Sequence, residues 1–304
     1  MNDQKPAAAA PANSEYRLGV ILVIACQLFW GVCPIYWEAL VPIESWKIIL
    51  YRIFTMFIYA YIAARIRYSR EEVFGPLKDR EVRRKYFFAG LILTANWSIY
   101  VWAMTSEHVV QASIGYYIEP IVICAVGIIF FKEKLTKYNL TAMMFALAAI
   151  ILILVHFRQV PGVALGLAGT WAVYSAIKKT SDKPVLLTMV YETMLYAALA
   201  LPAIIYIEAT GNGVIAMNMP VKYVMLFLSG LITVIPVGLF GAAAKKVPLL
   251  VIGLAQYISP TITLLIGVFM FGEPIDAVQI TAFGIIWIGL TIFSYGEFKH
   301  AKEQ

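Results

Sequence analysis

The chain has little of what metal and cofactor chemistry requires. It contains only three cysteines and three histidines in 304 residues. Cys26, Cys33 and Cys124 all lie in apolar runs, without a CxxC pair or a nearby histidine, so neither a zinc site nor a disulfide framework is predicted. GxxxxGK(S/T), HExxH and GxSxG motifs are also missing from the sequence. We therefore expect no metal, no cofactor, no ATP-driven step and no enzymatic activity.

Charged residues are scarce as well. They make up 14% of the chain, whereas 61% is hydrophobic and the mean hydropathy is +0.78. A soluble globular chain of this length does not need so much apolar surface, so the composition predicts an integral membrane protein. The net charge is +6, but the basic residues fall at the ends of apolar runs. This placement favours membrane lipids as partners and not nucleic acid.

Apolar runs close to the length of a membrane-spanning helix, about 20 residues, occur ten times. The sixth is the shortest and is interrupted by three glycines. We predict an all-α integral membrane protein with ten transmembrane helices. They are expected at about residues 18–37, 46–64, 85–104, 110–131, 138–156, 162–177, 185–207, 221–242, 249–271 and 278–296.

The basic residues predict the orientation of these spans. Twenty of the 24 Lys and Arg residues fall in the two tails and in alternate loops, eight of them between residues 65 and 85. The opposite loops hold only Lys47, Arg158 and Lys222. Because an excess of Lys and Arg marks the cytoplasmic side, we expect a plasma (cytoplasmic) membrane protein with both termini inside. Residues 1–17 are expected to be a disordered cytoplasmic tail, and 297–304 a second cytoplasmic tail.

Two segments 140 residues apart resemble each other. GYYIEPIVICAVGIIFFKEK aligns without gaps with AQYISPTITLLIGVFMFGEP, so that Tyr117 matches Tyr257 and Pro120 matches Pro260. If residues 18–156 and 162–296 each hold five spans, an odd number, the second half enters the membrane with opposite polarity. Inverted repeats are typical of secondary transporters, whose substrate site lies near the membrane midplane. A duplication retained for packing alone is the alternative.

Several motifs along the chain also point to a known family. They are FWGVCPIYW, ANWSIYVWAMTSEHVVQASIGYYIEP, TMVYETM, GLITVIPVGLFGAAA, and LAQYISPT followed by FGEP. Through these motifs the chain resembles the RarD family of EamA-type proteins, in the drug/metabolite transporter superfamily. The resemblance implies two inverted five-helix repeats of the EamA type and secondary transport of small molecules.

Two charged residues stand inside predicted spans. Arg52 lies about 9 Å along its helix from the outer end, and Glu119 lies about ten residues into the fourth span. A charge alone at mid-membrane is unfavourable by about 2.5 to 3.5 kcal/mol on insertion scales. We therefore predict that Arg52 pairs with Glu119 beside a central cavity. In the alternative arrangement Arg52 extends outward to the headgroups, and Glu119 bonds to local hydroxyls or water.

Prolines and other polar or aromatic residues complete the candidate site. Pro120 and Pro260 cannot donate a backbone hydrogen bond, so helix breaks that line a cavity are expected there. Amides and carboxylates that face lipid are costly, so polar residues in spans are expected to face the interior. The remaining candidate substrate-binding residues are Asn96, Trp97, Tyr100, Tyr116, Trp171, Tyr174, Glu192, Gln256 and Tyr257.

An aromatic cavity with one or two charges predicts a particular class of substrate. We expect transport by alternating access of a small amphipathic or zwitterionic organic molecule, such as an amino acid, an aromatic metabolite or a drug-like compound. The protein is expected to be a monomer or homodimer. Two other functions are compatible with the sequence: a membrane receptor or assembly partner that does not transport, and a lipid scramblase.

Overall fold

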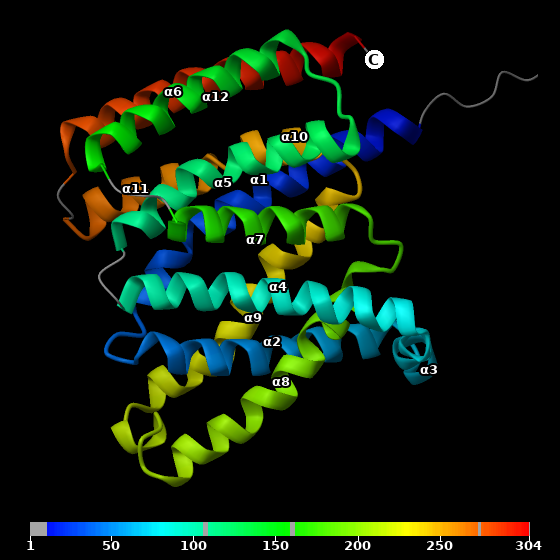
Figure 1. Ribbon diagram of the computed structural model, residues 1–304. Coiled ribbons are helices and arrows are strands. Elements are labelled where there is room, and N and C mark those ends of the chain that lie inside the picture. The colour runs from blue at the N-terminus through cyan, green and yellow to red at the C-terminus, as the bar shows by residue number, and fades with distance from the viewer. Residues whose placement is uncertain (1–10, 106–108, 159–161, 273–274, 304) are drawn as a thin grey trace, which may run out of the picture.

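The protein is a bundle of long helices. The computed structural model describes residues 11–105, 109–158, 162–272 and 275–303, and within these ranges the chain is helical and has no strand (Figure 1). The helices are α1 (Pro11–Glu38), α2 (Ser45–Arg67), α3 (Arg70–Phe74), α4 (Arg80–Thr105), α5 (Val109–Phe131), α6 (Lys137–Phe157), α7 (Gly162–Lys179), α8 (Val185–Ala209), α9 (Pro220–Ala244), α10 (Leu249–Ala255), α11 (Ile258–Met270) and α12 (Ala277–Glu303), with 3-10 turns at Gly75–Lys78 and Ile215–Met217.

Nine stretches of helix in the described part of the chain are long and apolar enough to cross a membrane, with α10 and α11 together forming one of them. The expected span outside this set is α7, which contains three glycines and ends in two lysines. Large apolar side chains such as Ile66 and Phe269, 83% and 80% exposed, cover the outer surface. Lipid is the solvent that such a surface requires. The protein is therefore a multi-pass all-α membrane protein.

Both termini of the described chain lie at one end of the bundle, where the first turns of α1 and the last turns of α12 meet (Figure 1). The Tyr16 hydroxyl donates to the Glu297 carboxylate there. Connections from other parts of the chain join at the same end, since Lys85 Nζ donates to the Thr180 carbonyl at 2.7 Å. We call this end, with the connections 68–79, 132–136, 180–184 and 245–248, the basic end.

The predicted disordered tail is partly wrong. α1 begins at Pro11, so residues 11–17 are helical where a disordered segment was expected. The helix continues beyond the apolar run because its first turns make tertiary contacts. Lys246 forms an ion pair with Glu15, in addition to the contact between α1 and α12 described above. The C-terminal tail also continues a helix, as far as Glu303.

The helices pack in pairs that link distant parts of the sequence. α2 lies against α8 and α9, α5 lies against α7 and α10, and α6 runs beside α12. In Figure 1 the α6–α12 pair forms one edge of the bundle, and α2 and α8 lie at the opposite edge. The interior positions of α1, α2, α4, α5 and α7 to α10 form one large apolar cluster. Polar residues buried within this bundle make up the candidate site.

Candidate functional site

Arg52 of α2 lies where α1, α2, α4 and α9 meet. Its guanidinium carbon stands 4.1 Å from the ring centroid of Trp97, 5.1 Å from that of Trp37 and 5.7 Å from that of Trp30. Its Nε donates to the Thr233 hydroxyl at 2.8 Å. The electron-rich faces of indole rings attract a cation, most strongly where water is excluded. Three tryptophans and one hydroxyl thus stabilise a charge that would be costly alone in this position.

The terminal nitrogens of Arg52, Nη1 and Nη2, have no hydrogen-bond or ion-pair partner among the described residues. Arg52 itself is only partly buried, and neither nitrogen is among the buried, unpartnered polar atoms of the described chain. A guanidinium carries five donors in a planar fork, and only the Nε–H is used here. The arrangement leaves the fork open to accept a planar anion such as a carboxylate.

Tyr100 and Tyr116 extend this site along α4 and α5. Their rings pack edge to face with centroids 6.1 Å apart. Tyr116 is 45% exposed, although it lies in an apolar helix. It precedes Glu119 by three residues on α5, so the two side chains share one face of that helix. Tyr116 therefore connects the tyrosine pair to the Glu119 side of the site.

The predicted ion pair between Arg52 and Glu119 is wrong. The two side chains form no salt bridge, and Glu119 Oε1 instead accepts a hydrogen bond from Gln256 Nε2 at 3.1 Å. The pair fails because both residues have partners on other helices, Arg52 on α1, α4 and α9 and Glu119 at the junction of α10 and α11. Gln256 Oε1 is buried without a hydrogen-bond partner. The carboxylate thus has one neutral neighbour and a second oxygen, Oε2, with no bond to any described residue.

The prolines behave differently in the two related segments. α5 continues through Pro120, so the predicted break is wrong at that position. The second segment is interrupted at Gln256 and Tyr257, before Pro260. At this interruption the Tyr257 hydroxyl donates to the Tyr117 carbonyl of α5 at 2.8 Å, so the second segment is bonded to the first.

Close packing accompanies this interruption. A Cβ atom on Gly253 of α10 would lie 2.6 Å from the Pro120 carbonyl oxygen, so only glycine permits the approach of α10 to α5. Glu133 and Glu273 also stand 140 residues apart in the two aligned segments. Glu133 is described, whereas Glu273 lies outside the described residues. Because α10 packs so closely on α5, the two related segments meet at their centres, beside Glu119.

A second polar cluster lies nearer the basic end. Lys178 Nζ stands 2.9 Å from Glu192 Oε1, and both side chains are 0% exposed. The Tyr174 hydroxyl donates to Glu192 Oε2 at 3.0 Å, and Lys178 also donates to the Thr188 hydroxyl at 2.8 Å. Trp171 and Phe240 cover the cluster with their rings. Glu192, expected in the cavity, is instead held in a closed ion pair.

Sequence reasoning missed Lys178 because it opens the polar segment KKTSDK, which resembles a surface turn. A signal was present in the spacing: Tyr174 and Lys178 are four residues apart on α7, and Thr188 and Glu192 are four apart on α8. Residues at this spacing share one face of a helix. Two such polar pairs on consecutive helices indicate a buried network.

Asn96 makes structural contacts with a neighbouring helix and does not form a free wall of a cavity. Its Nδ2 donates to the Leu167 carbonyl and to the Thr170 hydroxyl, both at 2.9 Å, and so joins α4 to α7. The predicted residues therefore fall into three groups. The first surrounds the open guanidinium or the Glu119 carboxylate and consists of Arg52, Trp97, Tyr100, Tyr116, Glu119 and Gln256. The second surrounds Lys178 and consists of Trp171, Tyr174 and Glu192. The third, Asn96 and Tyr257, joins helices to one another.

Comparison with known proteins identifies the family. A family model, described as the EamA-like transporter family, matches residues 17–155 and again residues 161–295. The chain belongs to the EamA-like transporter family. The match extends over almost the whole chain, and the expected resemblance to RarD-type EamA proteins is confirmed.

Individual relatives agree with this membership. A relative in Bacillus subtilis (strain 168), named uncharacterized transporter YojE, is 32% identical over 94% of this chain and 97% of its own length. Protein RarD of Streptomyces exfoliatus is 28% identical over 96% of this chain and 93% of its length. One crystal structure, 15% identical, matches with a TM-score of 0.71 over 91% of this chain and 97% of that chain. This last likeness concerns the fold alone.

Proposed function

We propose that this protein is a secondary transporter of small amphipathic or zwitterionic organic molecules, and that it binds the carboxylate of its substrate at Arg52. One observation carries the proposal: the guanidinium stands against three indole rings, and two of its nitrogens have no partner in the described part of the chain. Charge-assisted, bidentate hydrogen bonds to a carboxylate are strong and directional. Membership of a transporter family supports the proposal.

The surroundings of Arg52 favour an organic substrate with an apolar part. Tyr100, Tyr116 and Trp97 offer aromatic surface next to the guanidinium, which suits an aliphatic or aromatic side chain. Glu119 Oε2 has no partner in the described protein and is able to accept a hydrogen bond from a substrate ammonium group. Amino acids and aromatic carboxylic acids meet these requirements, whereas neutral sugars offer no carboxylate to Arg52 and inorganic ions do not use the aromatic surface.

We infer that the transporter consists of two inverted halves, 18–156 and 162–296, with ten spans in total. The packing supports this division, because contacts between helices recur when each span is replaced by its counterpart five spans later. α1 against α9 corresponds to α7 against α4, and α2 against α9 corresponds to α8 against α4. The repeated match of the family model supports the same division. Inverted halves provide the two conformations of alternating access.

We further propose that the described conformation is closed at the basic end. Glu133 follows α5, and its carboxylate accepts from the backbone N–H groups of Leu249 and Leu250 at 2.7 and 2.8 Å. Lys179 Nζ lies 3.5 Å from Glu133 Oε1 and donates to the Val247 carbonyl at 2.7 Å. A carboxylate at a helix N-terminus is favoured by the helix dipole. These contacts join the proposed halves and would have to separate to open this end.

We assign the basic end to the cytoplasm and the protein to the cytoplasmic membrane. The assignment rests on the Lys and Arg residues of the connections at this end. Both ends of the described chain, the start of α1 and the end of α12, lie there (Figure 1). A cysteine introduced in place of Lys78, in an otherwise cysteine-free variant, would be labelled by an impermeant reagent only from inside. A cysteine at Asn212 would be labelled only from outside.

Ligand binding to the purified protein tests the carboxylate proposal. Aromatic and aliphatic amino acids, each beside its primary amide, would be screened by thermal shift, because a ligand at 100 times its Kd stabilises the folded state by about 2.7 kcal/mol. We expect the acids to raise the apparent Tm and the amides to leave it unchanged. Arg52→Met should abolish the shift.

Lys47→Met is the matched control, since Lys47 is a cation on the same helix that pairs with Glu44 at 3.3 Å. It should retain the response. An acid that binds equally well to the Arg52→Met protein would overturn the assignment. A hit would then be tested for saturable counterflow in liposomes, where the absence of flux would contradict transport and leave the binding result standing.

A further inference from the structure

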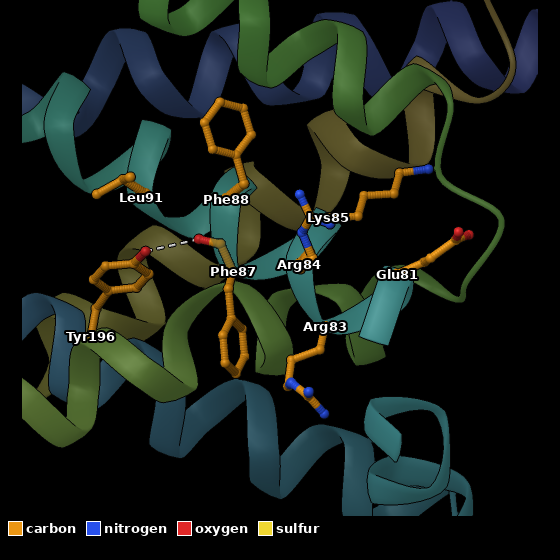
Figure 2. Close-up of a pocket in the computed structure, with 8 residues that line it drawn as sticks. All are labelled: Glu81, Arg83, Arg84, Lys85, Phe87, Phe88, Leu91 and Tyr196. Carbon is orange, nitrogen blue, oxygen red and sulfur yellow. Dashed lines mark hydrogen bonds between the residues drawn. The ribbon is translucent and has the colours of Figure 1, made fainter. Parts of the chain in front are cut away.

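A groove at the basic end, beside α4 and α8, is a candidate for a bound lipid. It has a volume of about 660 Å³ and is lined by Glu81, Arg83, Arg84, Lys85, Phe87, Phe88 and Leu91 of α4 and by Tyr196 of α8 (Figure 2). None of these residues belongs to the site around Arg52. The charged lining residues lie near the start of α4, and the aromatic and aliphatic ones follow them along that helix.

The order of residues along α4 matches the change from headgroup to acyl chain. Arg84, Phe88 and Leu91 are spaced by four and three residues and share one face of the helix, which Figure 2 shows for Arg84 and Phe88. Seven residues of helix span about 10 Å. Phe88 and Leu91 are each 49% exposed. A guanidinium at the membrane surface is thus followed, one and two turns deeper, by exposed apolar side chains.

The cation in the best position to bind a ligand has no partner among the residues that the structure describes. Arg83 Nη1 donates to the Leu77 carbonyl at 3.0 Å, and Lys85 Nζ donates to the Thr180 carbonyl at 2.7 Å. Arg84, in contrast, makes no hydrogen bond or ion pair with any residue that the structure describes, and it is exposed. Its planar fork suits a phosphate oxygen pair.

The two helices that line the groove, α4 and α8, are packed tightly against each other. α4 and α8 cross so closely that a Cβ atom on Gly90 would lie 1.9 Å from the Glu192 carbonyl oxygen. Tyr196 fixes the same crossing, because its hydroxyl donates to the Phe87 carbonyl at 2.8 Å, the bond drawn in Figure 2. The lining side chains are therefore held on two helices that cannot separate locally without breaking this contact.

We propose that this groove binds one anionic glycerophospholipid of the adjacent leaflet, with its phosphate on Arg84 and an acyl chain along Phe88 and Leu91. Three cations against the single carboxylate of Glu81 favour a headgroup with net negative charge over a zwitterionic one. The lipid touches both proposed halves, through α4 and through Tyr196 of α8. The identity of the leaflet rests on the proposed orientation; the chemistry of the groove does not.

Native mass spectrometry of the purified, delipidated protein tests the proposal. Dioleoyl phosphatidylglycerol should form a 1:1 adduct at lower concentration than dioleoyl phosphatidylcholine. Arg84→Gln should raise the apparent Kd for phosphatidylglycerol by about fivefold, the share expected of one basic residue near an anionic headgroup. Phe88→Ala should weaken the binding of both lipids, because it removes the acyl-chain contact and leaves the charges in place.

Arg67→Gln is the matched control, since Arg67 is an exposed arginine that ends α2 at the basic end and does not line the groove. It should leave the apparent Kd near that of the unchanged protein. Equal loss in the Arg84 and Arg67 variants would overturn the site, and so would equal affinity for the two lipids. Competition by soluble glycerol 1-phosphate as strong as by the lipid would also overturn it. These outcomes are read without transport, so they are independent of the proposed function.

Discussion

Two cations lie within the helical bundle, and their surroundings differ. Lys178 is 0% exposed and is bound by the Glu192 carboxylate and the Thr188 hydroxyl. Arg52 is partly exposed and faces three indole rings and one hydroxyl, with no carboxylate bound to it in the described structure. The first charge is already neutralised by the protein. The second is stabilised but not neutralised, and it is therefore available to a ligand.

This difference is the reason for which we assign the first charge a structural role and propose the second for substrate binding. A buried pair in which either partner is removed leaves an ion without compensation, so its members act together. A cation held by aromatic faces keeps its attraction for an anion, because the rings supply no net charge. Inside an apolar bundle a residue of the second kind is the better candidate for substrate binding.

The largest expected effect on stability comes from breaking the ion pair between Lys178 and Glu192. Lys178→Met should lower the free energy of unfolding by about 3 to 5 kcal/mol, because Glu192 then remains buried without a cation. Thermal or denaturant unfolding in detergent measures the change. The variant Lys178→Met, Glu192→Leu should recover most of the loss, since it removes both charges.

A Lys178→Met protein as stable as the unchanged one would show that the pair is not a structural element. The contrast between Lys178 as a structural charge and Arg52 as a charge proposed for substrate binding would then no longer hold. A double variant no more stable than the single one would show that the loss arises from packing against Gly241 and Phe240, which lie close to Lys178 and Tyr174, and not from the unpaired carboxylate.

The next effect concerns the stability of the open site. Arg52→Met should cost only about 1 kcal/mol of unfolding free energy, in contrast to the Lys178 variant, because no buried anion is left behind. The Thr233 hydroxyl keeps its bond to the Ser229 carbonyl at 2.9 Å. The same unfolding measurement applies, and a loss as large as that of Lys178→Met would mean that Arg52 is structural.

The tryptophans allow a finer test. Trp97→Leu should weaken binding of a carboxylate ligand about fivefold, corresponding to about 1 kcal/mol of cation–π stabilisation. Trp30→Leu should have a smaller effect, because its ring centroid lies 5.7 Å from the guanidinium and that of Trp97 lies 4.1 Å away. Ligand titrations of both variants supply the comparison, and the reverse order would contradict the geometry.

The smallest effect on stability is expected at Glu119. Glu119→Gln keeps a hydrogen-bonding partner for Gln256, and its new NH2 group is able to reach the unpartnered Gln256 Oε1, so unfolding should change by less than about 0.5 kcal/mol. Binding of amino acids should weaken, whereas binding of the corresponding desamino acids should not. Equal effects on both ligand series would exclude a contact between Glu119 and an ammonium group.

The wrong prediction for Arg52 and Glu119 shows what sequence reasoning omits. The two arrangements considered gave Arg52 a carboxylate or the lipid headgroups, and Glu119 a cation, hydroxyls or water. In the structure the partners are neutral: indoles and a hydroxyl for Arg52, and one amide for Glu119. Thr233 and Trp37 carry little signal of a site in the sequence, because Thr233 stands inside an apolar run and Trp37 stands at the end of one, beside Glu38. Lys178 was missed because its segment resembles a surface turn.

The sequence by itself determined that this chain is a helical membrane protein with its basic residues gathered at one end, because hydropathy and charge add up along a local segment. It also provided the motifs of the EamA-like family. Only the tertiary structure decided which cation is paired with a carboxylate, Lys178, and which has none bound among the described residues, Arg52. Arg52 meets Thr233 across 181 positions and Glu119 meets Gln256 across 137. Such contacts depend on how each helix is rotated about its axis against its neighbours, and no local pattern fixes that rotation.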